Sequence, residues 1–173
     1  MTTALLLVDV QRNMLEGDAP VPAAAEVRPR LETLLDRART AGALVVHVQN
    51  DGSQGDPDLP HTEGWELVFP TRDGELVLRK DDCDTFAANP GWAADLASRG
   101  VDHVVVAGMQ SEYCVSATSR GALGHGLRVS VAGGAHATYD DGPTAAEISA
   151  DAEKQLTADG VSVVPAEDVD FTT

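Results

Sequence analysis

Hydrophobic residues along this chain are concentrated in short runs with few polar interruptions. These runs occupy residues 4–10, 43–49, 75–80, 101–108, 127–133 and 161–164. The runs at residues 4–10 and 43–49 are nearly continuous and lack the regular alternation of a half-exposed sheet, which is typical of strands buried on both faces. The pattern therefore predicts six strands, the first ending in a charged residue, Asp9.

Segments with helical spacing lie between these runs. Apolar residues in the segment 23–40 recur at helical intervals: Val27, Leu31, Leu34, Leu35 and Ala38. We expect Pro29 in the first turn of this helix and Gly42 at its end. Further helices are predicted at residues 92–99, 114–126 and 144–159. The segment 50–74 is rich in Gly, Pro and Asp and predicts a long functional loop or lid.

Strands that alternate with helices are typical of parallel βαβ units joined by right-handed crossovers. We therefore predict an α/β protein with a single doubly wound, mostly parallel six-stranded sheet in the order 3-2-1-4-5-6 and helices on both faces. No linker or internal repeat divides the chain, so residues 1–173 are expected to form one domain.

Composition narrows the classes of partner. The formal charge is −16, from 28 acidic and 12 basic residues. Such a chain repels phosphate backbones and anionic lipid, so we expect no nucleic-acid and no membrane partner. No apolar segment approaches the roughly 20 residues of a membrane span, and the N-terminal run has no basic flank. We expect a cytoplasmic protein that acts on a small molecule.

Chemically useful side chains collect at the predicted carboxyl ends of the strands, where open α/β sheets bind ligands. Asp9 places a charge in an apolar run and needs a cation or donors nearby, although it could also cap a turn. Lys80, one of two lysines, could supply that cation or be an ordinary solvated residue.

Cys114 is the candidate nucleophile. It lies where the fourth strand is predicted to lead into a helix, and a helix N-terminus favours the thiolate. Together with Lys80 this predicts a lowered pKa of the thiol, against the opposing effects of burial and Asp9. The alternative is a buried filler residue, which is the interpretation we assign to Cys83.

Other residues near the same edge are candidates for lining a substrate pocket. They are Gln11, Trp65, Phe86, Tyr113, His136 and Tyr139.

Three blocks of sequence resemble those of a known family. LLLVDVQRNM, LRKDDCDTF and AGMQSEYCVSATSRGALGHGLRVSVAGGAHATYD are similar, in order and spacing, to the signature blocks of the isochorismatase-like cysteine hydrolases. This group includes nicotinamidases, N-carbamoylsarcosine amidases and streptothricin hydrolase. The resemblance runs from about residue 3 to residue 164.

The resemblance implies roles for individual residues. Asp9, Lys80 and Cys114 would form a catalytic triad, and the Met109–Gln110 peptide would be cis. The backbone N–H groups of Gln110 and Cys114 would form the oxyanion hole. The implied reaction is hydrolysis of an amide, ureido or lactam C–N bond through a thioester, without a cofactor. Relatives of this kind also imply a homo-oligomer, either a dimer or a tetramer.

Two departures from the family pattern bear on function. Nicotinamidases hold a metal with an Asp-x-His pair and a further His, whereas Asp51 here is followed by Gly52 and Ser53, with His61 alone downstream. We therefore predict no catalytic metal. Gly134 replaces the usual acidic residue after the fifth strand. Two alternatives stay open, an ether or vinyl-ether hydrolase and a non-catalytic binder or thiol sensor.

Overall fold

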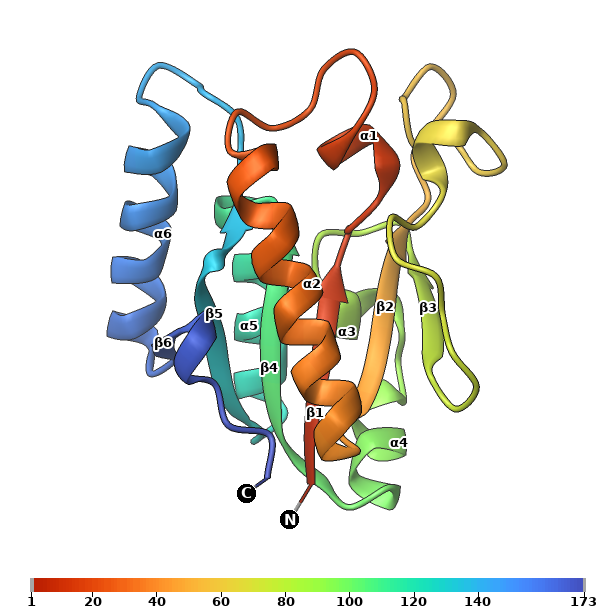
Figure 1. Ribbon diagram of the computed structural model, residues 1–173. Coiled ribbons are helices and arrows are strands. Elements are labelled where there is room, and N and C mark those ends of the chain that lie inside the picture. Colours follow the sequence, from red (N-terminus) through yellow and green to blue (C-terminus); the bar gives the residue numbers. More distant parts are fainter. Residues whose placement is uncertain (1, 173) are drawn as a thin grey trace.

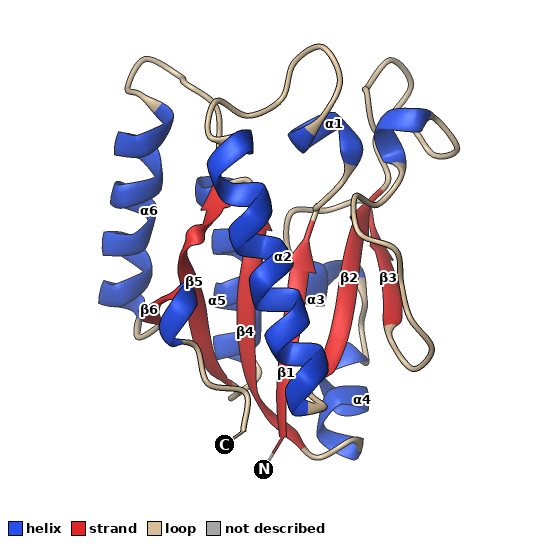
Figure 2. Ribbon diagram, viewed as in Figure 1, coloured by secondary structure: helices blue, strands red, loops and turns tan. Residues whose placement is uncertain are grey.

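The computed structural model describes residues 2–172 and contains one six-stranded sheet. Its strand order is β3-β2-β1-β4-β5-β6, and every neighbouring pair is parallel (Figure 2). The strands are β1 (Thr2–Val8), β2 (Leu44–Asn50), β3 (Leu76–Lys80), β4 (Val101–Met109), β5 (Arg128–Ala137) and β6 (Ser162–Pro165). The predicted class and strand order are confirmed.

Helices cover both faces of this sheet. They are α1 (Arg12–Leu15), α2 (Ala24–Ala41), α3 (Thr85–Ala88), α4 (Trp92–Ser98), α5 (Ser116–Gly124) and α6 (Ala145–Asp159). In Figure 1, α2 crosses the front of the sheet while α3, α4 and α5 lie behind it. Each face has its own apolar core, so the central strands β1, β2 and β4 are buried from both sides, whereas the edge strands β3 and β6 are partly exposed.

Helix ends follow the expected chemistry at most positions. Gly42 and Gly160 adopt left-handed conformations, with φ of 71° and 99°, and close α2 and α6. Thr144 forms a capping box with Glu147 at the start of α6. The expectation that Pro29 occupies the first turn of α2 is wrong. The helix starts at Ala24, so Pro29 lies in the second turn.

Several local features were not predicted. The short helices α1 and α3 were not among the predicted helices, and β5 extends to Ala137 through a shift in its register with β4. The helix expected from Cys114 begins instead with a π-helical turn, Ser111–Val115, and becomes α-helical at Ser116. The spacing of apolar residues in the sequence does not distinguish these short or irregular turns from an ordinary helix or a loop.

The strand register brings the candidate residues to one edge of the sheet. Val8, the last residue of β1, is paired with Val48 of β2 and Gly108 of β4, and Asn50 is paired with Lys80. Gly108 has φ of 122°, and a Cβ there would overlap the backbone of Val8. This close approach holds the two central strands together where the site begins, at the top of Figure 1.

Residues 2–172 contain no helix that is both long enough and apolar enough to cross a membrane.

Candidate active site

The ammonium group of Lys80 lies at the centre of a compact polar cluster. Its Nζ donates to Asp9 Oδ2 at 3.1 Å, to Asn50 Oδ1 at 2.9 Å and to Cys114 Sγ at 3.4 Å. The Lys80 side chain is fully buried, with 0% of its surface exposed. Although β3 is separated from β1 by β2, the long lysine side chain reaches across to Asp9. The structure thus brings together the three residues chosen as the triad.

Asp9 occupies an unusual backbone conformation directly after β1. Its φ is 51°, in the left-handed region that Asp tolerates better than most residues, and its N–H donates to Val48 O at 2.9 Å. The residue is only 3% exposed. Among residues 2–172, Oδ1 of Asp9 has no hydrogen-bond partner, and the carboxylate is held through Oδ2 by Lys80.

Asn50 belongs to this cluster, although it was not among the predicted site residues. It is the last residue of β2 and therefore lies at the same edge of the sheet as Asp9 and Lys80. Its Oδ1 accepts from Lys80, while its Nδ2 donates to Asp58 Oδ2 at 2.7 Å. Its backbone N–H donates to Gln11 Oε1 at 2.8 Å. These contacts fix which way the amide points, because a flipped amide would present N–H groups to the ammonium. Its position opposite Lys80 in the predicted sheet was the signal available.

Cys114 lies in the π-helical turn that follows β4, and its side chain is partly exposed. The Met109–Gln110 peptide that precedes the turn is cis, as the family resemblance implies. The structure therefore places Cys114 two residues before α5 rather than at the first residue of an α-helix. Cys83, by contrast, is exposed, so its interpretation as a buried filler residue is wrong. It lies close enough to Cys114 to be one of the groups that raise the pKa of that thiol.

The electrostatics of the cluster differ from the sequence expectation for the thiol. Burial raises the pKa of Cys114, the charge of Asp9 raises it further, and Lys80 only partly offsets these effects. Burial also raises the pKa of Asp9 against the opposing effect of Lys80. The expectation that the cation and the helix terminus would lower the thiol pKa is therefore wrong, because burial and Asp9 outweigh them.

The pKa of Lys80 shifts in the direction that keeps it charged. Burial alone would lower it, but the Asp9 carboxylate and the Cys114 sulfur raise it above its ordinary value. The Lys80 cation therefore faces two acidic groups, Asp9 and Cys114. If these two groups together keep one proton, one of them is neutral, the other carries one negative charge, and the cluster has no net charge. Moving that proton from sulfur to carboxylate creates a thiolate without changing the total charge.

A second buried hydrogen-bond network supports the turn that carries Cys114. Ser111 Oγ lies 2.8 Å from His136 Nδ1 and 2.9 Å from Ser149 Oγ, and His136 Nε2 lies 2.9 Å from Glu153 Oε1. The Ser111 carbonyl also accepts from Ser116 Oγ at 2.6 Å. The first residue of the turn is therefore tied to β5 and α6. The network ties the turn of Cys114 to β5 and α6 in addition to the contact between Cys114 and Lys80.

A cavity of about 750 Å³ lies near the cluster. Asp9, Lys80 and Cys114 do not line it themselves; the cavity reaches the cluster through Asp58, which is bonded to Asn50, and through Gln110, which precedes the turn of Cys114. Its walls come from α1 and the loop that follows it, from the segment around Asp58, and from Gln110 and Tyr139. The lining residues are Arg12, Asn13, Met14, Glu16, Gly17, Asp18, Ala19, Asp56, Pro57, Asp58, Glu63, Gly64, Gln110 and Tyr139. A volume of this size accommodates a drug-sized molecule. The predicted functional loop, 50–74, thus forms one of its walls.

Two of the six predicted pocket residues lie at or beside this cavity. Tyr139 lines it and donates through its hydroxyl to Ala19 O at 2.8 Å. Gln11 is buried beneath it, where its Nε2 donates to Asn50 O and Trp65 O, both at 3.0 Å. Gln11 therefore fastens the 50–65 segment to the end of β1 and α1 rather than facing a substrate.

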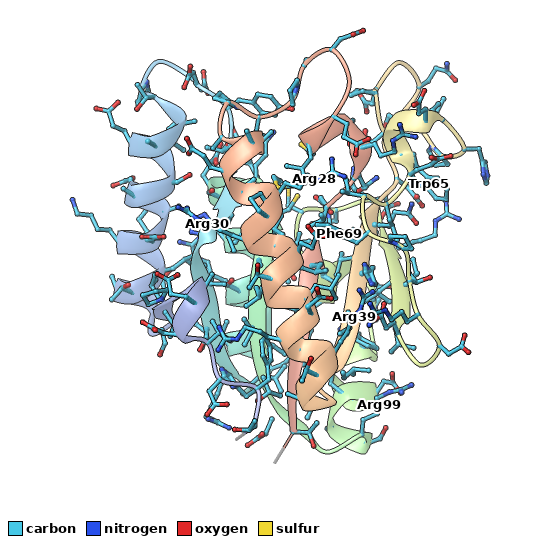
Figure 3. All side chains as sticks on the ribbon, viewed as in Figure 1. Arg28, Arg30, Arg39, Trp65, Phe69 and Arg99 are labelled. Carbon is cyan, nitrogen blue, oxygen red and sulfur yellow. The ribbon has the colours of Figure 1, made fainter. Side chains whose placement is uncertain are left out.

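The other four predicted pocket residues do not line the cavity. Trp65 donates through Nε1 to Asp51 at 2.8 Å and lies at the outer side of the site (Figure 3). Phe86 is buried in the core between the sheet and α5. His136 belongs to the buried network described above, and Tyr113 points outward with 52% of its surface exposed. Aromatic character alone did not distinguish core residues from residues that face a cavity.

Asp51 and His61 lie in the segment where nicotinamidases bind a metal, and here both contact other side chains. Asp51 forms an ion pair with Arg79, at 2.8 Å from Nη2, and His61 packs against the ring of Trp65. Within residues 2–172 no three His, Cys, Asp or Glu side chains are clustered in a way that could hold a metal ion. The guanidinium of Arg79 is thus the charged partner of Asp51 in this structure.

Gly134, the other departure, has a structural reason. Its φ is 79°, and a Cβ at this position would lie 3.0 Å from Arg30 Nη1. The same guanidinium nitrogen donates to Gly134 O at 3.2 Å. A larger residue would have to displace Arg30 and adopt a backbone conformation that L-residues rarely take. Figure 3 shows Arg30 extending from α2 toward β5.

Comparison with known proteins shows that this chain belongs to the isochorismatase family. The model of the Isochorismatase domain matches residues 3–164. Two proteins of Streptomyces noursei, each named streptothricin hydrolase, are 53% identical over 84% of this chain and 45% identical over 94% of it. These alignments cover 53% and 68% of the two relatives, so the chain corresponds to little more than half of the first.

A solved structure described as an isochorismatase from Pseudomonas putida KT2440 has a TM-score of 0.88 with this chain. The two are 26% identical, and the superposition covers 98% of this chain and 90% of the other.

Proposed function

Because this chain belongs to the isochorismatase family, we propose that it is a cysteine hydrolase that cleaves a C–N bond of a small amide, ureido compound or lactam. One observation carries the proposal: the buried ammonium of Lys80 contacts both the Asp9 carboxylate and the Cys114 sulfur. Burying three ionisable groups together costs free energy that an ordinary core would avoid. Their position near a cavity of about 750 Å³ gives the arrangement a use.

In the proposed mechanism, Asp9 is the general base. The raised pKa of Cys114 keeps the thiol protonated before the substrate binds. Asp9 then accepts the thiol proton, the sulfur attacks the substrate carbonyl, and Lys80 stabilises the negative charge through each step. Asp9 returns the proton to the leaving nitrogen. A water molecule activated by Asp9 hydrolyses the resulting thioester.

The backbone N–H groups of Gln110 and Cys114 are proposed to stabilise the tetrahedral oxyanion. Gln110 lines the cavity, and its N–H donates to no backbone carbonyl in the described part of the chain. A donor directed at the developing oxyanion typically contributes about 2.7–4 kcal/mol to transition-state stabilisation. Both donors flank the same turn, so the network through Ser111 also holds the oxyanion hole in place.

Streptothricin is the first natural compound to test as a substrate, since two relatives that cover most of this chain bear the name streptothricin hydrolase. A third relative, maleamate amidohydrolase of Pseudomonas putida, is 30% identical over 74% of this chain. Maleamate and simple primary amides therefore belong in the same screen, with release of ammonia or a new amine as the measurement.

The alternatives make different predictions. An ether hydrolase would release an alcohol or carbonyl product without ammonia or amine. A thiol sensor would oxidise at Cys114 and form no adduct with substrate. The cysteine hydrolase should show an acyl adduct on Cys114 by mass spectrometry after brief exposure to substrate.

The decisive variants are Cys114→Ala and Cys114→Ser, which should fold normally and lose turnover. Cys83→Ala is the matched control, because Cys83 is exposed and is not among the groups to which Lys80 donates in the described part of the chain, and it should keep most activity. Full activity in Cys114→Ala would end the proposal, as would equal loss in both cysteine variants.

A further inference from the structure

The cavity near the triad is strongly acidic. Five of its lining residues carry carboxylates: Glu16, Asp18, Asp56, Asp58 and Glu63. Arg12 is the one cationic side chain among the lining residues. It is already engaged, because its guanidinium pairs with Glu16 at 2.8 Å and with Glu63 at 2.6 Å. Arg28 of α2 provides a second cation for Glu16 at 2.7 Å (Figure 3).

Three carboxylates of the wall have no such partner. Among residues 2–172, neither Asp18, Asp56 nor Asp58 forms an ion pair with a lysine, arginine or histidine. Asp18 and Asp56 are exposed at the rim and can be solvated. Asp58 is different because it is only 8% exposed. A buried carboxylate without a cation is costly unless something compensates its charge.

The surroundings of Asp58 satisfy one of its two oxygens. Oδ2 accepts from Asn50 Nδ2 at 2.7 Å, and no hydrogen bond to Oδ1 is formed by the described residues. Gly52 leaves the space that this oxygen needs, since a Cβ at Gly52 would overlap Asp58 Oδ1. Asp58 is connected to Lys80 through Asn50, because the Oδ1 atom of Asn50 accepts from Lys80 Nζ at 2.9 Å.

We propose that Asp58 is the binding site for a cationic group of the substrate, with Asp18 and Asp56 extending the same acidic wall outward. The substrate class is then an amide that carries an ammonium or guanidinium group. This inference rests on the proposed function for the identity of the reaction, but the charge selectivity of the cavity can be measured without any hydrolysis.

The Asp58 carboxylate accounts for the preference in physical terms. A cation about 4 Å from a carboxylate gains about 1 kcal/mol even at the dielectric constant of bulk water, which corresponds to about fivefold in a rate or affinity. In a partly closed cavity the effect is larger. A bound cation would also offset the influence of Asp58 on Asp9, which the neighbouring charge makes harder to ionise.

The test measures the reactivity of Cys114 toward thiol reagents of different charge. In a Cys83→Ser background, trimethylammonioethyl, methyl and sulfonatoethyl methanethiosulfonate supply a cationic, a neutral and an anionic probe. The rate ratio of cationic to anionic probe at Cys114 should exceed that of a small free thiol by about fivefold or more at low salt. The neutral probe corrects for changes in thiol ionisation.

Asp58→Asn should lower this ratio by about fivefold or more. Asp73→Asn, an exposed carboxylate outside the cavity, is the matched control and should leave the ratio unchanged. If Asp58→Asn does not fold, the rim variants Asp18→Asn and Asp56→Asn should each lower the ratio by a smaller factor. A wild-type ratio equal to that of the free thiol, or one unchanged in all three variants, would overturn the proposal.

A second measurement separates this inference from the proposed function. An amide carrying a free amino group and its N-acetylated counterpart are compared as substrates, and kcat/KM should favour the cationic one in the wild type. Hydrolysis of both at equal rates overturns the cation site and leaves the hydrolase. Charge-selective labelling of Cys114 without hydrolysis of any amide supports the cation site and rejects the hydrolase.

Discussion

The coupling between Lys80 and Cys114 can be measured directly once Asp9 is made neutral. In the wild type the three groups titrate together, so a change at Lys80 also alters the proton on Asp9. Asp9→Asn removes this complication, and it should lower the pKa of the thiol because the charge of Asp9 is one of the causes that raise it. Adding Lys80→Met should then raise the thiol pKa, since the stabilising ammonium is lost.

The size of this second shift follows from the distance between the two atoms. Nζ of Lys80 lies 3.4 Å from Sγ of Cys114. Two unit charges at this separation interact by about 5 kcal/mol at an effective dielectric constant of about 20, and by about 1.2 kcal/mol in bulk water. These values correspond to about 3.6 and about 0.9 pKa units. Because the Lys80 side chain is fully buried, we expect a shift toward the upper value.

The assay is the rate of iodoacetamide alkylation of Cys114 against pH, in a Cys83→Ser background so that one thiol reacts. Asp9→Asn and the double variant Asp9→Asn/Lys80→Met are compared with the wild type. Asp9→Asn should alkylate faster than wild type at neutral pH, yet it should lose amide turnover for lack of a general base. The double variant should alkylate more slowly than Asp9→Asn.

Superimposable pH profiles for Asp9→Asn and the double variant would refute the reasoning. They would mean that the ammonium does not stabilise the thiolate despite its short distance. Lys80 would then serve only to neutralise Asp9, and the proposed stabilisation of the sulfur during catalysis would have to come from elsewhere.

Three further predictions follow from other parts of the structure. EDTA should leave activity unchanged, and loss of activity that zinc or manganese restores would reveal an overlooked metal site. Ser111→Ala should lower kcat with little change in KM, because it loosens the turn that carries Cys114. If the variant instead loses activity only in proportion to the fraction of protein that is unfolded in thermal unfolding, Ser111 has a structural role alone. The buried pairing with Arg39 and other donors outweighs desolvation and lowers the pKa of Glu75 to about 2 from an ordinary 4.5. Its contribution to the free energy of unfolding should therefore be complete above pH 4.5 and be lost as pH falls toward 2, and Glu75→Gln should remove on the order of 3 kcal/mol at pH 7 in urea unfolding.

The sequence was sufficient to predict the fold because its central strands are buried on both faces. The run that ends at Asp9 could not be a half-exposed strand or a surface helix, and each apolar run except the second is followed by a segment of helical spacing before the next run. The rule that ligands bind at the carboxyl ends of strands then selected Asp9, Lys80 and Cys114. The structure places all three within one hydrogen-bonded cluster.

What the sequence could not supply was the direction of individual side chains. Phe86 and His136 were expected to face a pocket, but they point into the core and into a buried network. Asn50, which orients its amide toward Lys80, is an unremarkable residue in the chain. The pKa of Cys114 depends on how deeply the site is buried, a property that emerges only when the strands and loops are assembled.

The strand order has one more consequence, which concerns how the protein could be divided. β1, β2 and β3 form one half of the sheet and β4, β5 and β6 the other, and the halves meet at the pairing of β1 with β4. Asp9, Asn50 and Lys80 all belong to the first half, whereas Cys114 belongs to the second. A chain cut between α3 and α4 would separate the proposed base from the proposed nucleophile. On the proposed mechanism neither fragment is active alone, and turnover recovered on mixing them would report complementation across the pairing of β1 with β4.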